Sequence, residues 1–122
     1  MDESIFSTIK KMLGYGPLYD PDDAFDLNIM ISINTYLGVL NDFGVGKEGF
    51  AIESEKETWE DFLEDSEVSL NEAKTYLYMR VKQAFDPPAS SVLAEAYNKQ
   101  IDELGWRMME KVACAKLRGP EV

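Results

Sequence analysis

The sequence predicts an all-α protein, a single-domain helical bundle of about four to five helices with an acidic loop between the second and third long segments. Apolar residues recur at helical spacing in several long segments, and capping residues and glycines bracket those segments. Pro87 and Pro88 separate the last two segments, because proline cannot continue a helix interior. With 122 residues, 45% of them hydrophobic, the chain is long enough to bury one core.

The first helix is predicted over residues 5–13, where Ile5, Ile9 and Leu13 share one face. Ser4 is suited to cap its start, and Gly14 stands where a left-handed residue often ends a helix. Residues 14–21 contain two glycines and two prolines and are expected to form a connector.

A long helix is predicted to follow, capped by Asp22 or Asp23 and ending near Phe43 with Gly44 behind it. Its residues are apolar nearly all round, apart from a narrow stripe of polar side chains. A helix of this kind is usually the buried centre of a bundle.

The middle of the chain is an acidic, glycine-bearing loop over residues 45–57, within which residues 50–52 could be extended. Thr58 has the spacing of a capping box and predicts a short helix that holds the loop to the core. Ser69 and Glu72 form a second capping box at the start of a helix that runs to Phe85.

Asp86, Pro87 and Pro88 are predicted to make a tight structural corner, with the last helix starting near Ala89 or Ser91 and ending about residue 116. Gly105 is expected to be a weak point of that helix. The predicted domain spans residues 1–117, and residues 118–122 are expected to be a flexible tail. The inner face of the last helix is assigned to Val92, Ala96, Leu104, Met108 and Val112, with Leu93 and Ile101 close by.

The charge is strongly acidic and unevenly spread. There are 23 acidic and 12 basic residues, which gives a net charge of −11. The segment 47–67 holds nine acids and two lysines, whereas residues 71–122 are close to neutral. Such a surface repels nucleic acid and anionic membranes. The longest uncharged stretch, 27–41, is also shorter than the ~20 apolar residues of a membrane span.

The sequence offers little for catalysis or metal binding. It has no histidine, so acid–base chemistry and nucleophiles that depend on imidazole are excluded. The single cysteine, Cys114, is best explained as a small packing residue. The aspartates between residues 20 and 26 do not match a calcium loop, because Phe25 and Ile31 occupy the glycine and glutamate positions. We therefore expect no enzyme, no cofactor and no metal.

Tyr76 and Tyr78 could in principle stack on nucleic-acid bases. Sites of that kind also carry a basic groove for the backbone, and none is evident here. Packing in the core or at its rim is the better interpretation of both tyrosines.

Several segments carry a family resemblance. They are LNDFGVG at 40–46, FAIE at 50–53, TWEDFL at 58–63, KTYLYMRVK at 74–82 leading into FDPP at 85–88, and QIDELGWR at 100–107. On these segments the chain resembles the phage head–tail connector family, the head-completion adaptors of long-tailed phages and prophages. It departs from that pattern at Gly105 and in residues 108–122.

The resemblance implies a structural virion protein at the head–tail interface, assembled in the bacterial host cytoplasm. Its partners would be the portal protein, further copies of itself in a ring of the portal's twelve-fold symmetry, and a stopper or tail-completion protein. DNA would pass through the ring without specific binding, and no membrane is involved. The alternative is an acidic binding module that mimics DNA and occupies a nucleic-acid-binding protein.

Two sets of residues are assigned to this function as hypotheses. The interface set is basic and consists of Lys74, Arg80, Lys82, Arg107, Lys111, Lys116 and Arg118. The channel-facing set is acidic and consists of Glu53, Glu55, Glu57, Glu60, Asp61, Glu64 and Asp65. Because ring contacts join two different patches of one chain, we expect the acidic half to meet the lysine-bearing half.

Overall fold

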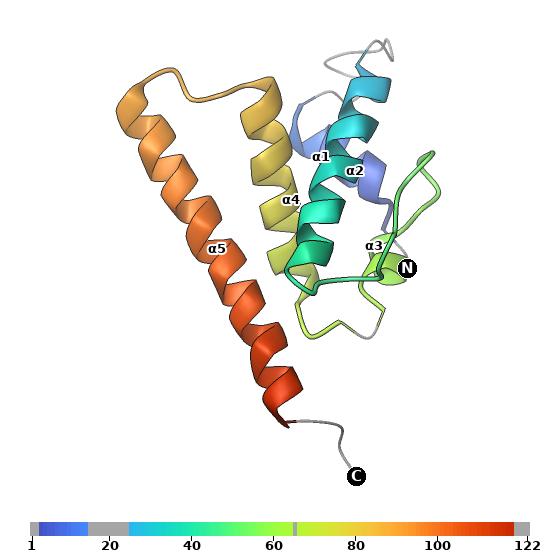
Figure 1. Ribbon diagram of the computed structural model, residues 1–122. Coiled ribbons are helices and arrows are strands. Elements are labelled where there is room, and N and C mark those ends of the chain that lie inside the picture. Colours follow the sequence, from blue (N-terminus) through green and yellow to red (C-terminus); the bar gives the residue numbers. More distant parts are fainter. Residues whose placement is uncertain (1–2, 15–24, 65, 119–122) are drawn as a thin grey trace.

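The computed structural model describes residues 3–14, 25–64 and 66–118, and within them the chain is all-helical (Figure 1). No strand occurs in these residues, and the predicted extended piece at 50–52 is a loop. The all-α prediction is confirmed. The helices are α1 (Ile5–Met12), α2 (Asp26–Asp42), α3 (Trp59–Phe62), α4 (Leu70–Phe85) and α5 (Ser91–Arg118).

The predicted caps hold where they depend on neighbouring residues. The hydroxyl of Ser4 accepts a hydrogen bond from the Ser7 backbone, and that of Thr58 accepts one from Asp61. Ser69 and Glu72 form a complete capping box at the start of α4. Gly14 has a φ of 89°, so it adopts the left-handed conformation predicted after α1.

The predicted start of α2 is wrong. The helix begins at Asp26 with Phe25 as its N-cap residue, and no side chain makes the cap hydrogen bond. Asp22 and Asp23 lie outside the described residues. The end of α2 is as predicted, because Gly44 follows it in the left-handed conformation.

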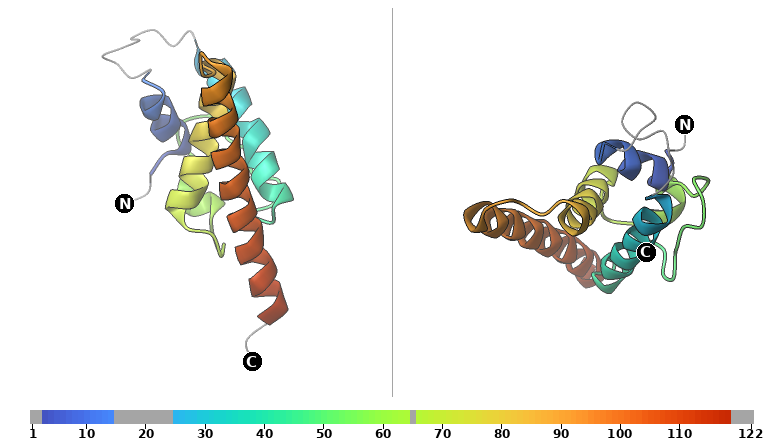
Figure 2. Two further views of the ribbon diagram at one scale, coloured as in Figure 1. Left: turned by 90° about the vertical axis from the view of Figure 1, so that its left-hand side faces the viewer. Right: turned by 90° about the horizontal axis from the view of Figure 1, so that it is seen from above.

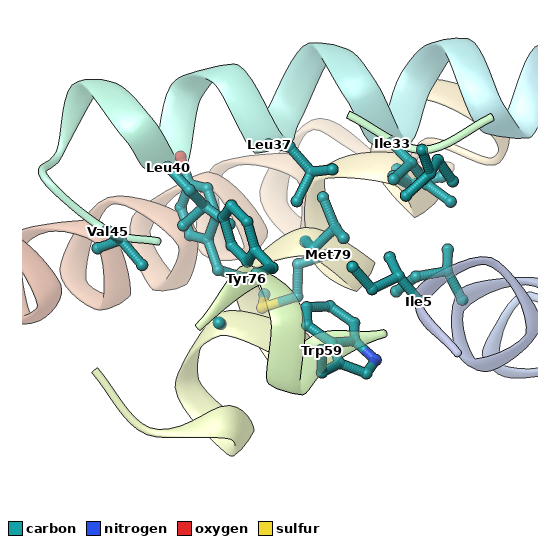
Figure 3. Close-up of a cluster of buried hydrophobic side chains, with 14 of the residues drawn as sticks. Ile5, Ile33, Leu37, Leu40, Val45, Trp59, Tyr76 and Met79 are labelled. Carbon is teal, nitrogen blue, oxygen red and sulfur yellow. The ribbon is translucent and has the colours of Figure 1, made fainter. Parts of the chain in front are cut away.

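The core lies between α4 and the helices on either side of it. α4 packs against α2, α1 and α5, and α3 adds the buried side chains of Trp59 and Phe62 to the core. Figure 3 shows Trp59 among the core side chains. The predicted inner residues of α4 are buried at Ala73, Leu77 and Val81, whereas Ala84 is exposed. The fully buried side chains of the core include Ile5, Ile9, Ile29, Ile33, Leu37, Leu40, Val45, Trp59, Phe62, Leu77 and Met108.

The expectation that α2 is the buried centre of the bundle is wrong. Its inner face is covered, but Leu27 is 69% exposed and Ile31 is 56% exposed. Leu27 and Ile31 remain open although the loop is hydrogen-bonded to α2 close by, through Asn34 and Asn41. Apolar character alone did not reveal which side is open.

The link between α4 and α5 also differs from the prediction. α4 ends at Phe85 as expected before Pro87 and Pro88, but α5 begins only at Ser91. The hydroxyl of Ser90 caps the new helix by accepting from Leu93. The link at 86–90 is therefore not a tight corner, and it reaches sideways from α4 to α5 (Figure 1).

The predicted inner face of α5 is correct only for the second half of the helix. Leu104, Met108 and Val112 face the body, whereas Val92 and Leu93 are 73% and 60% exposed, and Ala96 is exposed as well. α5 diverges from α4 toward its first turns, so those turns have nothing to pack on (Figure 2).

Gly105, expected to weaken α5 through its low helix propensity, is buried. A Cβ at this position would lie 3.2 Å from the Phe43 ring and 3.4 Å from the Tyr76 ring. The missing side chain lets both rings lie against the helix backbone. The glycine thus fits the packing of α5 on the ends of α2 and α4.

Candidate functional site

The acidic loop is held in place by two asparagines of α2. The side-chain amide of Asn34 donates to the Ile52 carbonyl (3.0 Å), and its oxygen accepts from the Ile52 backbone (2.7 Å). Asn41 donates to the carbonyls of Val45 and Lys47 and accepts from the Gly49 backbone. These polar residues of α2 therefore order a loop that has no secondary structure of its own.

The far end of the loop is attached to the start of α1. Ile5 donates a backbone hydrogen bond to Glu57, and Trp59 donates one to Glu3, around an antiparallel bridge between Ser4 and Thr58. Two segments more than fifty residues apart in sequence thus lie side by side. The loop is fixed at both of its ends.

Glu57 differs from the other predicted channel-facing acids because it is used inside the loop. Its carboxylate accepts from the backbones of Glu53 and Ser54 and from the Ser54 hydroxyl. Burial alone would raise the pKa of Glu57, but these hydrogen bonds outweigh it and hold the pKa below its ordinary value. Glu57 is therefore a structural residue of the loop.

The remaining described members of the acidic set lie on the surface. They are Glu53, Glu55, Glu60, Asp61 and Glu64, and all are exposed. Asp65 lies outside the described residues. The loop and α3 lie on the opposite side of the body from α5 (Figures 1 and 2). The structure thus brings five of the seven predicted acids together on one outer side.

The basic set does not form a single surface. Lys74 pairs with Glu3 (3.0 Å), and Lys82 pairs with Asp86 (3.1 Å). The Arg80 guanidinium lies 5.1 Å from the centre of the Tyr36 ring, and its Nε donates to the Tyr76 hydroxyl. These three cations are therefore engaged in contacts within the chain.

Lys111 is also used internally, because it pairs with Glu72 of the α4 capping box at 2.5 Å and so ties α5 to α4. Burial would raise the pKa of Glu72, but hydrogen bonds from Lys111 and Ser69 outweigh it and lower the pKa. Arg107 and Lys116 are exposed and form no ion pair with any residue that the structure describes. The side chain of Arg118 lies outside that description.

The described residues contain no arrangement that suggests chemistry. No group of three or more Cys, Asp or Glu residues among them could hold a metal ion. Cys114 is exposed, so its assignment as a packing residue is wrong. Tyr76 is buried and Tyr78 is half-buried, as expected for packing. No helix in this part of the chain is both long and apolar enough to cross a bilayer.

Sequence reasoning missed a set of exposed apolar side chains. On α5 they are Trp106 (59% exposed), Met109 (41%) and Leu117 (87%), and on α2 they are Leu27 and Ile31. The signal was a second apolar stripe on each helix, separate from the stripe assigned to the core. On α5 this stripe lies on the side opposite Leu104 and Met108.

The fold and its surfaces define a class: a small helical protein equipped with charged and apolar faces for binding other macromolecules. A family model described as phage connector protein matches residues 5–113. The match covers most of the chain and all of α1 to α4, so the chain belongs to the phage connector protein family, and the predicted membership is confirmed. No curated protein and no solved structure matches the chain.

Proposed function

We propose that the protein is a head-completion adaptor that forms a ring under the portal, extends the DNA channel and presents a docking surface for stopper or tail proteins. The match of residues 5–113 to the phage connector family carries this proposal. The family is structural, so we assign the chain a structural role in the virion. Assembly would take place in the host cytoplasm, before the tail joins.

The acidic loop supports a position along the DNA path. Binding of DNA to proteins gains free energy when cations of the protein replace counterions on the phosphates. Carboxylates such as Glu53, Glu60 and Asp61 provide no such gain and repel the phosphates. A ring lined by this loop would let DNA slide past without being held.

The positions of the acidic loop and of α5 support ring formation. Rings are closed by heterologous contacts, in which two different patches of one chain meet on neighbouring copies. The acidic loop and α5 lie on opposite sides of the body, so two such patches are available (Figure 2). Lys99, Arg107 and Lys116 are exposed cations of α5 that are available to a neighbour's acids.

Reconstitution with the portal protein of the same phage tests the adaptor role. The purified protein should add to portal rings in a fixed stoichiometry, visible by electron microscopy as an extra ring coaxial with the channel. A protein that leaves portal rings unchanged would contradict the proposal. The DNA-mimic alternative makes the opposite forecast, because a mimic should displace DNA from a basic protein and leave the portal unbound.

Charge-neutralising variants test the role of the loop. The combined variant Glu53→Gln, Glu60→Gln and Asp61→Asn should still join the portal ring but should slow DNA passage or retain duplex at low salt. The matched control neutralises three exposed acids of α5, Glu95, Asp102 and Glu103, and it should leave DNA retention unchanged. If the two variants retained DNA equally, the placement of the loop along the channel would be contradicted.

A further inference from the structure

Arg80 is a half-buried cation that has no acidic partner in the described chain. Three other cations in these residues are half-buried, and each pairs with a carboxylate within 3.1 Å: Lys10 with Asp26, Lys74 with Glu3 and Lys82 with Asp86. Arg80 forms no ion pair with any described residue, although the chain has 23 acidic and 12 basic residues. A charge that leaves water without a counter-ion costs free energy. The counter-ion of Arg80 is therefore to be sought outside the described chain.

Two tyrosines hold the guanidinium of Arg80 in one orientation. Its Nε donates to the Tyr76 hydroxyl (3.1 Å). Its central carbon, Cζ, lies 5.1 Å from the centre of the Tyr36 ring and 5.6 Å from that of the Tyr76 ring, within the range of cation–π contacts. Neither Nη atom donates a hydrogen bond to a described residue, and the protein does not enclose either of them. The edge formed by Nη1 and Nη2 is therefore oriented and open to a ligand.

The hydroxyls of the same two tyrosines also lack an acceptor in the described chain. The Tyr76 hydroxyl accepts from Arg80 but donates to no described residue, and the Tyr36 hydroxyl forms no hydrogen bond with this part of the chain. Burial raises the pKa of Tyr76, Arg80 lowers it, and Asp102 and Tyr36 raise it, so these groups lie near one another. Tyr36, Tyr76 and Arg80 thus form a cluster of hydrogen-bond donors on α2 and α4.

The charge next to the cluster favours a singly charged anion. Asp102 of α5 is exposed and does not form an ion pair with Arg80. Its negative charge repels a phosphate group, with about −1.5 to −2 charges at pH 7, more strongly than it repels a carboxylate. The two Nη groups of an arginine also match the two oxygens of a carboxylate. The ligand chemistry that fits best is therefore a carboxylate.

We propose that Arg80, oriented by Tyr36 and Tyr76, binds the carboxylate of an acidic side chain on a partner protein. Nη1 and Nη2 donate to the two carboxylate oxygens, and the partner's charge replaces the counter-ion that the chain itself does not supply. The tyrosines act as positioning residues, because they fix the guanidinium before the partner arrives. This reduces the ordering that binding would otherwise require.

Acetate is the probe for this site in the full-length, ¹⁵N-labelled protein. The chain has three arginines, Arg80, Arg107 and Arg118, whose Nε–H signals are followed by NMR while acetate replaces chloride at constant ionic strength. The Arg80 signal should saturate at an acetate concentration about tenfold lower than the Arg107 signal, as one additional hydrogen bond to a charged group predicts. Arg107 is the matched control, because it is exposed and forms no ion pair with a described residue. Equal responses of the two arginines would overturn the inference.

Tyr76→Phe tests whether the tyrosine positions the guanidinium. The substitution keeps the buried ring and removes only the hydroxyl that accepts from Arg80. It should raise the acetate concentration that saturates the Arg80 signal by about tenfold, the effect of one hydrogen bond to a charged group. Tyr78→Phe makes the same change at a half-buried tyrosine of α4 and should leave the titration unchanged. An unchanged titration in Tyr76→Phe would contradict the positioning role.

A double-mutant cycle tests whether Asp102 is the missing counter-ion. Arg80→Gln and Asp102→Asn are combined in urea unfolding, and Lys74→Gln with Glu3→Gln serves as the reference for a true ion pair at 3.0 Å. The coupling between Arg80 and Asp102 should be much the smaller of the two. A coupling as strong as that of the reference pair would make Asp102 the partner of Arg80 and would overturn the inference.

Two binding assays identify the protein that supplies the carboxylate. Arg80→Gln and the control Arg107→Gln are compared in sedimentation velocity of the protein alone and in binding to the portal. A loss of about tenfold or more in Arg80→Gln alone assigns the carboxylate to a second copy in the first assay and to the portal in the second. If Arg80→Gln self-associates and binds the portal as the wild type does, the inference is wrong. The acetate titration does not depend on the adaptor role, which fails separately if the wild type leaves portal rings unchanged.

Discussion

The turn after α2 offers the sharpest test of how the loop is built on the core. Gly46 has a φ of 80°, in the left-handed region. A Cβ added there would overlap the Phe62 ring, and even the third-nearest ring carbon would be 2.8 Å away. Phe62 is fully buried and lies against Phe50, with ring centres 5.3 Å apart. The ring therefore has no open space into which it could turn.

The cost of Gly46→Ala follows from these two effects. A left-handed conformation costs an alanine about 1–2 kcal/mol relative to glycine. Overpacking a filled core adds about 1–3 kcal/mol. We expect Gly46→Ala to lower the free energy of unfolding by about 2–5 kcal/mol, the sum of both.

Gly49→Ala is the matched control. Gly49 has nearly the same φ, 76°, but an added Cβ would meet no described atom within 4 Å. It should cost only the backbone effect, about 1–2 kcal/mol. Urea unfolding followed by circular dichroism measures both variants. If the two substitutions cost the same, the contact between Gly46 and Phe62 does not constrain the core, and the reasoning is refuted.

Three further predictions concern α4 and α5. Leu77→Ala should cost about 2–5 kcal/mol in urea unfolding, because the side chain is fully buried, and a near-neutral result would mean that another face of α4 is inside. The folded state lowers the pKa of Glu72. The ionised Glu72 carboxylate therefore stabilises the fold at any pH above the ordinary glutamate pKa, and this effect is lost as the pH falls through the lowered pKa. Glu72→Gln should therefore be less stable than the wild type at neutral pH and show a flatter decline on acidification, and parallel pH profiles would contradict this. Gly105→Ala gains about 1 kcal/mol of helix propensity but loses about 1–3 kcal/mol by crowding Phe43, whereas Gly38→Ala gains the propensity alone. Thermal melts should therefore rank Gly38→Ala above Gly105→Ala, and the reverse order would refute the packing argument.

The parts of the fold that could be predicted depend on residues close in sequence. The Ser4 and Ser69 caps and the glycines after α1 and α2 act over three or four positions, so their spacing was sufficient. Pro87 and Pro88 likewise marked the end of α4. The path of the link after them was not predictable, since it depends on where α5 lies.

Only part of the candidate site could be predicted, again because the sequence reveals local features better than distant contacts. The acids of the loop are exposed as expected, because a dense run of like charges stays in water. The interface role of the basic set stays a prediction, but the sequence did not reveal that Lys74 and Lys111 find partners on distant segments. Those partners, Glu3 and Glu72, are 71 and 39 residues away in sequence.

By itself the sequence determined the helical class, the helix ends set by local caps, the acidic character and the family. Only the tertiary structure decided which sides of α2 and α5 remain open and which cations are already paired. The physical reason is that a cap is satisfied within one turn of its own helix. The covering of a helix face depends on elements brought there by the rest of the chain, and an apolar stripe looks the same in sequence whether or not something covers it.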